Sequence, residues 1–111
     1  MRMWNIDPKV MCRQHLLGEH LEMHMFAGCL LKEVSLKGYI KNGLVEVHHI
    51  RKRHRFLVRE MKRRHYNHRS ELPSFIAPVL GKVDKEFNLV ELACRCAGCK
   101  EKIEERRNLD G

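Results

Sequence analysis

Hydrophobic residues recur with a helical period in three stretches of the chain, and polar residues fill the positions between them. No stretch shows the strict alternation of hydrophobic and polar residues that is typical of a half-buried strand. The sequence therefore predicts an all-α fold, a compact single domain of three main helices with long irregular connections. The three predicted helices cover about residues 8–26, 45–65 and 88–106.

Residues at the ends of these stretches support the same division. Asp7-Pro8 favours a helix start, because Asp accepts hydrogen bonds from free N–H groups and Pro at the first position gives none up. The segment from Asn88 to Glu91 resembles a capping box at the start of the third helix. We expect residues 32–44 to form a loop with one short helical turn, and residues 67–84 to form an irregular connection.

The first predicted helix has two hydrophobic flanks, with a line of polar residues between them. His15, Glu19 and Glu22 lie on this line, whereas His20 and His24 lie on the opposite side. A helix that is hydrophobic on two flanks is expected near the centre of a domain. The polar line is therefore expected to face a cleft, where Glu19 and Glu22 could serve as a carboxylate pair for acid and base catalysis.

The positive charge of the chain is concentrated in one segment. The 111 residues carry a net charge of +8, and residues 51–69 hold nine Lys and Arg against one acid, so the other 92 residues are balanced. In the second predicted helix the cations occupy one face and hydrophobic residues the other, which is typical of a helix that binds phosphates. The cationic face consists of Arg51, Arg55, Arg59 and Lys62, which with the neighbouring Lys52 are the candidate phosphate-binding residues.

The size of the chain and its five cysteines restrict the class of protein. A length of 111 residues predicts one domain, residues 1–111, without room for a separate cofactor domain. No hydrophobic run approaches the length of a membrane span, and the N-terminus lacks the regions of a secretory signal. An odd number of cysteines fits a reducing compartment better than a disulfide framework. We expect a cytoplasmic, monomeric protein.

Two local patterns could indicate a metal site. One Cys-x-x-Cys motif occurs among Cys94, Cys96 and Cys99, and such a motif can supply half of a zinc site. Histidines could supply the remaining ligands. Cys96 and Cys99 also continue the hydrophobic face of the third helix, so we interpret them as structural thiols and keep a zinc-stabilised protein as an alternative. The segment from His20 to His24 lacks the Glu that a zinc protease carries directly after its first His, and we expect an outward-facing histidine pair.

Several of these residues together resemble the pyrimidine-dimer DNA glycosylase family, in its bacterial branch. The resemblance covers about the first 67 residues. It is carried by Met1-Arg2, by Gln14-His15-Leu16 and Glu22 on the first helix, and by residues 50–53 and 59–63 leading to Tyr66-Asn67.

The resemblance implies a DNA-repair glycosylase with AP-lyase activity that acts on UV pyrimidine dimers without a cofactor or a metal. In this family the N-terminal α-amine forms a Schiff base with C1′ of the damaged nucleotide, and β-elimination then cuts the strand. The catalytic residues would be Met1, which a following Arg protects from removal, and Glu22. An α-amine suits this role because its ordinary pKa is much lower than that of a lysine.

The resemblance also assigns the DNA contacts. Arg2 and His15 would contact the phosphates and the substrate, while the basic second helix would hold the backbone of double-stranded DNA with a damaged or abasic site. Two family arginines beside the catalytic Glu are replaced, with Leu21 before Glu22 and His24 or Met25 after it. The alternatives are a non-catalytic nucleic-acid-binding module and the small zinc-stabilised protein that uses Cys94, Cys96 and Cys99.

Overall fold

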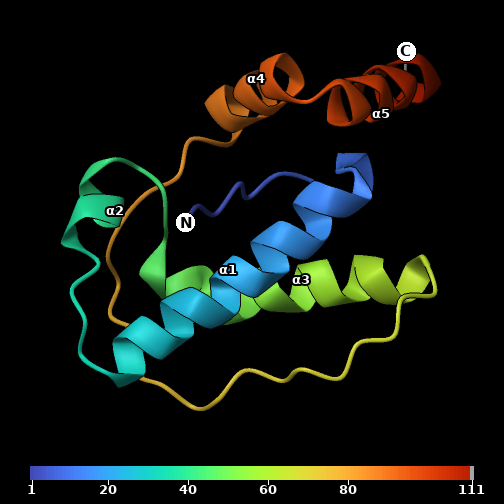
Figure 1. The fold of residues 1–111 in the computed structure, drawn as a ribbon. Coiled ribbons are helices and arrows are strands. Elements are labelled where there is room, and N and C mark those ends of the chain that lie inside the picture. The colour runs from blue at the N-terminus through green and yellow to red at the C-terminus, as the bar shows by residue number, and fades with distance from the viewer. Residues whose placement is uncertain (111) are drawn as a thin grey trace.

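The chain folds into a bundle of α-helices and short 3-10 helices, with no strand among residues 1–110 (Figure 1). The computed structural model describes these 110 residues, and the side chains as far as residue 108. The prediction of an all-α fold is confirmed. The elements in chain order are η1 (Pro8–Val10), α1 (Arg13–Leu31), α2 (Lys37–Lys41), η2 (Val47–His49), α3 (Ile50–Arg63), α4 (Lys85–Arg95) and α5 (Ala97–Asp110).

The first predicted helix is divided in the structure, and it extends further than expected. Asp7 caps the 3-10 helix η1 by accepting a hydrogen bond from the Lys9 N–H at 3.0 Å, and Pro8 is its first residue. Cys12 then adopts an extended conformation and is the N-cap residue of α1. The predicted start signal is therefore real, but it begins a separate short helix. The helix α1 continues through Gly28 to Leu31.

Helices α1 and α3 pack against each other and form the centre of the molecule (Figure 1). The predicted hydrophobic side of the second helix is confirmed, since Ile50, Leu57 and Met61 are buried. The helix begins five residues later than expected because residues 47–49 form the 3-10 helix η2. His65 follows α3 with a φ of 64°, the left-handed conformation that commonly ends a helix.

The predicted third helix is two helices, and its predicted cap is wrong. The N-cap residue of α4 is Asp84, whose carboxylate accepts from the Phe87 N–H at 3.0 Å. Asn88 lies inside the helix instead, and its side-chain amide donates to the Trp4 carbonyl at 2.9 Å. At Cys96 the backbone becomes extended, and this break separates α4 from α5. The two helices cover the N-terminal segment of the chain (Figure 1).

The connections agree with the expected loops. The short turn expected within residues 32–44 is α2, and the long connection after α3 contains no helix or strand until α4 begins. Gly81 is required in this connection. It has a φ of 90°, and a Cβ atom at this position would lie 2.2 Å from the Val45 carbonyl oxygen. This close approach holds residues 80–83 against the start of η2. No helix in the described part of the chain has the length and hydrophobicity needed to cross a membrane.

Candidate active site

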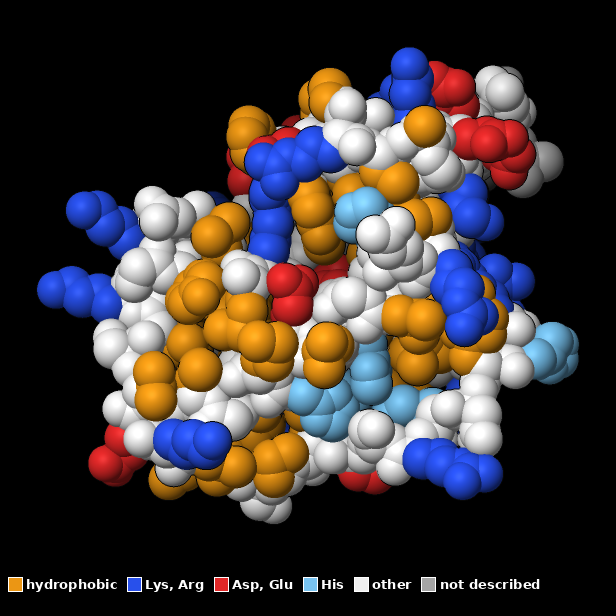
Figure 2. Space-filling view, viewed as in Figure 1, with side chains coloured by type: hydrophobic (Ala, Val, Ile, Leu, Met, Phe, Trp, Pro, Cys, Tyr) orange, Lys and Arg blue, Asp and Glu red, His pale blue; other side chains and the backbone are white. Residues whose placement is uncertain are grey.

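A cleft of about 1140 Å³ lies between the N-terminal segment, α1 and α4. Figure 2 shows acidic side chains in the hollow on this face, below Lys and Arg side chains. Four predicted site residues line the cleft, namely Met1, Arg2, His15 and Glu22. The segments that carry them, the N-terminus and α1, also contribute side chains to the core. Four of the predicted site residues are therefore brought together in one cleft. The polar line on the first helix predicted a cleft at His15 and Glu22, whereas Met1 and Arg2 were indicated by the family resemblance alone.

The N-terminal amine and the Glu22 carboxylate face each other in this cleft. The Met1 nitrogen lies 3.9 Å from Glu22 Oε1, and the two side chains are 11% and 30% exposed. Burial raises the pKa of the Glu22 carboxyl group above its ordinary value, although the positive amine and the Arg2 N–H act in the opposite direction. The cleft therefore places the N-terminal amine beside a carboxyl group that exchanges its proton nearer to neutral pH than an ordinary glutamate.

The position of the amine is determined by hydrogen bonds to the adjacent backbone. The Met3 N–H donates to the Leu44 carbonyl at 2.7 Å. The Asn88 side-chain amide donates to the carbonyls of both Met3 and Trp4. Met3 and Trp4 are buried, so the chain preceding them cannot shift without disturbing the core. The first residue is thus positioned by a segment that is anchored in the core.

Arg2 is already engaged by protein groups. Its guanidinium donates to Asn88 Oδ1 at 2.6 Å and to the Glu91 carboxylate, and it stacks 3.9 Å from the centre of the Trp4 ring. Its Nε atom is buried, and no group in the described part of the chain accepts a hydrogen bond from it. The side chain therefore connects the N-terminal segment to α4, while it also forms part of the cleft wall.

Glu19 and Glu22 do not act as a pair, contrary to the expectation from their spacing. The Glu19 carboxylate accepts from Arg53 Nε at 2.5 Å and from Arg53 Nη2 at 2.8 Å, and the two side chains are 0% and 2% exposed. Arg53 also donates to the Ile6 carbonyl at 2.6 Å. Glu19 is therefore committed to a buried ion pair, and Glu22 is the carboxylate that faces the amine.

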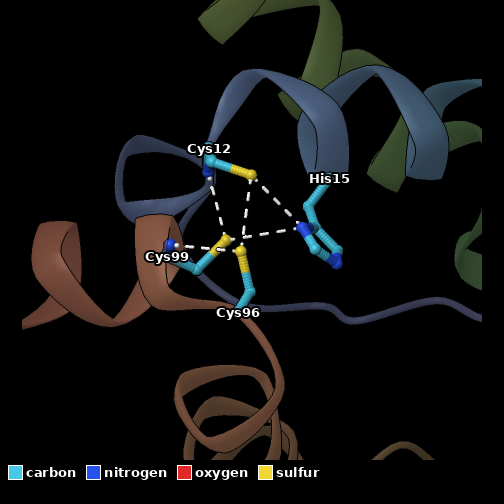
Figure 3. Close-up of side chains that lie close together, drawn as sticks. All are labelled: Cys12, His15, Cys96 and Cys99. Atoms are coloured by element: carbon cyan, nitrogen blue, oxygen red, sulfur yellow. Dashed lines mark hydrogen bonds between the residues drawn. The ribbon is translucent and has the colours of Figure 1, made fainter.

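The cysteines form a cluster, but not the one that the sequence indicated. Cys94 is exposed on α4 and lies outside it. Cys96 and Cys99 instead meet Cys12 and His15, and the four potential ligand atoms all lie within 4.8 Å of one another (Figure 3). The prediction missed Cys12, because a single Cys before a helix is not a metal signal. His15 belongs to both the cluster and the cleft.

The basic side chains of α3 lie apart from the cleft. Five of them, which we call the basic ladder, are exposed, and none of the five lines the cleft. The basic ladder consists of Arg51, Lys52, Arg55, Arg59 and Lys62. Arg53, which contributes to the charge of the same segment, is buried against Glu19. The cleft cations that the sequence did not single out are Lys82 and Arg95. No sequence motif around either residue indicates a role in this site. They reach the cleft only because folding brings α4 and the residues before it next to the N-terminus.

The histidines of α1 are also placed differently from the expectation. His20 and His24 do not face outward, since both pack against His54 of α3, and His20 also packs against His68. Burial, followed by the repulsion between these imidazoles, lowers the pKa of His20 and of His54 to about 4. This cluster lies on the side of α1 that faces α3, so it is separate from the amine and Glu22.

Comparison with known families and structures completes the description of the site. Residues 1–74 match a family that is described as pyrimidine dimer DNA glycosylase. No curated protein and no solved structure matches the chain. The matched region includes Met1 and the Glu22 carboxylate of α1, and it ends before α4 and α5. Half of the cysteine cluster therefore lies outside the region that the family describes.

Proposed function

We propose, since the chain belongs to the pyrimidine dimer DNA glycosylase family, that it excises damaged pyrimidines from DNA through a Schiff base with its N-terminal amine. The observation that carries this proposal is the Met1 nitrogen, which lies 3.9 Å from Glu22 Oε1 in the cleft. An amine beside a carboxyl group is the arrangement that nucleophilic attack on a sugar carbon requires. The same intermediate would then support an AP-lyase step.

In the proposed reaction, Glu22 moves protons and Met1 forms the covalent bond. The neutral amine attacks C1′, the bond to the base breaks, and the base leaves as it gains a proton. The amine, positively charged once it is bonded to C1′, loses one proton. The bond between C1′ and the ring oxygen O4′ then breaks as O4′ gains a proton, and an iminium bond joins Met1 to C1′. A base then removes a proton from C2′, and the 3′ phosphate leaves by β-elimination. The raised pKa of the Glu22 carboxyl group suits it to accept and return these protons near neutral pH.

We further propose that the cleft cations hold the phosphates next to the damaged nucleotide. Lys82 and Arg95 line the cleft from outside α1, where Leu21 and Met25 occupy the positions beside Glu22. Arg95 contacts the Glu91 carboxylate at 2.5 Å, but its side chain is 60% exposed. In this proposal Lys82 and Arg95 take the phosphate contacts that arginines of α1 would make. Arg2 is engaged by Glu91, so its proposed role is to keep the amine in position while it contributes positive charge.

The basic ladder would bind DNA phosphates at a second surface. Its side chains are exposed on α3, and they do not line the cleft. Contacts to phosphate supply affinity that depends on salt and is independent of sequence. In this proposal the basic ladder increases the residence of the protein on DNA, and the cleft carries out the reaction. A damaged nucleotide must leave the base stack to reach the amine, which is easier where pairing is already weakened.

Borohydride trapping tests this function. Reduction of the Schiff base should join the protein covalently to DNA that contains an abasic site, and mass spectrometry of a proteolytic digest should place the adduct on the α-nitrogen of Met1. Glu22→Gln should keep DNA binding and lose strand cleavage, whereas Glu71→Gln, at an exposed position of the connection after α3, should keep both.

Two results would contradict the proposal. Trapping at full yield in a protein with one extra residue before Met1 would exclude the N-terminal amine as the nucleophile. DNA binding without any trapping or cleavage would favour a non-catalytic nucleic-acid-binding module instead.

A further inference from the structure

Four side chains from distant parts of the chain meet beside the cleft. Cys12 and His15 come from the start of α1, while Cys96 and Cys99 come from the break between α4 and α5. The Cys12 and Cys96 sulfurs belong to residues 84 positions apart and lie 3.8 Å from each other. Figure 3 shows the three sulfurs and the His15 ring directed toward a common centre.

The distances agree with the edges of a tetrahedron around one metal ion. Zinc–sulfur bonds of about 2.3 Å and zinc–nitrogen bonds of about 2.0 Å place neighbouring ligand atoms roughly 3.5 to 3.8 Å apart. His15 Nδ1 lies 3.2 Å from Cys12 Sγ and 3.7 Å from Cys99 Sγ. With the 3.8 Å between Cys12 Sγ and Cys96 Sγ, three edges of the tetrahedron are close to the required lengths. A disulfide would need this last pair of sulfurs at about 2.0 Å.

The surroundings of the sulfurs favour thiolates that are bound to a cation. The backbone N–H of Cys12 donates to Cys99 Sγ at 3.2 Å, and the N–H of Cys99 donates to Cys96 Sγ at 3.4 Å. Such N–H groups stabilise negative charge on sulfur. The Cys99 side chain is also buried, where a negative charge without a partner is costly. A metal ion supplies the charge that would make the buried thiolate stable.

We propose that Cys12, His15, Cys96 and Cys99 bind one zinc ion in a closed, four-coordinate structural site. Three thiolates and one imidazole form a donor set that is typical of structural zinc. The ion would attach the α4 and α5 pair to the start of α1, and this attachment maintains one wall of the cleft. Zinc binding by these residues does not depend on the proposed glycosylase activity, although the site borders the same cleft. Zinc ligation replaces the interpretation of Cys96 and Cys99 as structural thiols.

The zinc ion would also determine the protonation of His15. With Nδ1 bound to the metal, the remaining proton lies on Nε2, which then acts as a hydrogen-bond donor. Because His15 lines the cleft, this donor is available to a phosphate or sugar oxygen of bound DNA. His15 would thus be a positioning residue of the zinc site and a contact of the cleft at the same time.

Metal analysis of the full chain, purified without added zinc, tests the proposal. We expect one zinc per chain by mass spectrometry of the metal content. Release by a mercurial reagent should follow the modification of the thiols. Cys96→Ser should lose the zinc, whereas Cys94→Ser, at an exposed cysteine two residues away, should retain it. His15→Cys should also retain the zinc, because a fourth thiolate can replace the imidazole.

A second measurement remains informative even if Cys96→Ser does not fold. The wild-type chain reconstituted with Co²⁺ should show the intense visible bands of tetrahedral cobalt and a thiolate charge-transfer band in the near ultraviolet. A wild-type chain without metal and with all five thiols free would overturn the proposal. A Cys12–Cys96 disulfide, or iron with inorganic sulfide in place of zinc, would also overturn it. The same holds if a folded Cys96→Ser protein keeps its zinc while His54→Asn loses it.

Discussion

The role of Glu19 can be tested by removing its charge and keeping its shape. Glu19→Gln leaves the Arg53 guanidinium at 2% exposure without a negative partner. The amide oxygen can still accept one hydrogen bond, so the variant removes mainly the compensation of charge. We expect the protein to lose stability, while the amine, Glu22 and the cleft remain unchanged in the molecules that stay folded.

The expected loss of stability in Glu19→Gln follows from the burial of the ion pair. Breaking a buried ion pair by removing one partner costs about 3 to 5 kcal/mol, because the remaining charge is far from water. The retained hydrogen bond puts Glu19→Gln near the lower limit, at about 3 kcal/mol. A domain of this length has an unfolding entropy of roughly 0.23 kcal/mol per degree, so the melting temperature should fall by about 13 °C. A stability of about 5 to 15 kcal/mol would leave the variant folded at 25 °C.

Urea unfolding followed by circular dichroism measures this change, and Glu22→Gln is the matched control. It makes the same substitution one turn further along α1, at a carboxyl group that is 30% exposed. Its unfolding free energy should change by less than about 1 kcal/mol, because the ion pair that it removes is long, at 3.9 Å to the Met1 amine, and Glu22 is partly exposed. The double variant Glu19→Leu with Arg53→Met removes both charges, so it should recover most of the stability. Unchanged stability in Glu19→Gln together with lost cleavage would refute this reasoning and assign Glu19 to catalysis.

Three further predictions concern other parts of the molecule. His54 has a pKa lowered to about 4, so the unfolded chain binds more protons than the folded chain. Stability should therefore decrease, by at most about 3 kcal/mol, as pH falls from 6.5 toward 4. Urea unfolding should show a flatter dependence of stability on pH for His54→Asn, and an equal slope would contradict the assignment. The double variant Arg55→Glu with Arg59→Glu should weaken duplex binding and reduce the slope of log K against log salt concentration by about two units. Trapping on abasic DNA should be retained at low salt. An unchanged salt slope in fluorescence anisotropy would remove the basic ladder from the DNA interface. Gly81→Ala should cost about 1 to 3 kcal/mol, since its Cβ would lie 2.2 Å from a carbonyl oxygen at a φ of 90°. Gly28→Ala on α1 should be neutral or stabilising in thermal unfolding, because among the described residues its Cβ would meet no atom within 4 Å beyond its chain neighbours and the backbone of its own helix. Equal effects of the two would be evidence against the close approach.

Local signals in the sequence were reliable where neighbouring residues decide the structure. The hydrophobic side of α3 and the cap at Asp7 follow from contacts within one or two helical turns, and both are confirmed. The capping box at Asn88 was wrong, because that side chain is used by the N-terminal backbone 84 residues away. The break at Cys96 was also missed, since its helical pattern continues through α5.

The charge of residues 51–69 illustrates the same limit. Counting charges predicted a cationic helix, and the exposed basic ladder agrees with the count. The count could not show that Arg53 is buried against Glu19, nor that Arg63 and Arg64 share the carboxylate of Glu60. The Arg53–Glu19 pair depends on which side of α3 faces α1, whereas the two Glu60 pairs are contacts within α3 at i,i+3 and i,i+4.

The sequence by itself determined the helical fold class, the concentration of positive charge and the N-terminal pattern of a DNA glycosylase family. These features depend on residues that are close together along the chain. The tertiary structure alone decided that Glu22, and not Glu19, faces the Met1 amine, and that Cys12 and His15 join Cys96 and Cys99. The physical reason is that a reactive pair or a ligand set requires distances of a few ångströms between side chains, and packing brings together residues that lie more than 80 positions apart.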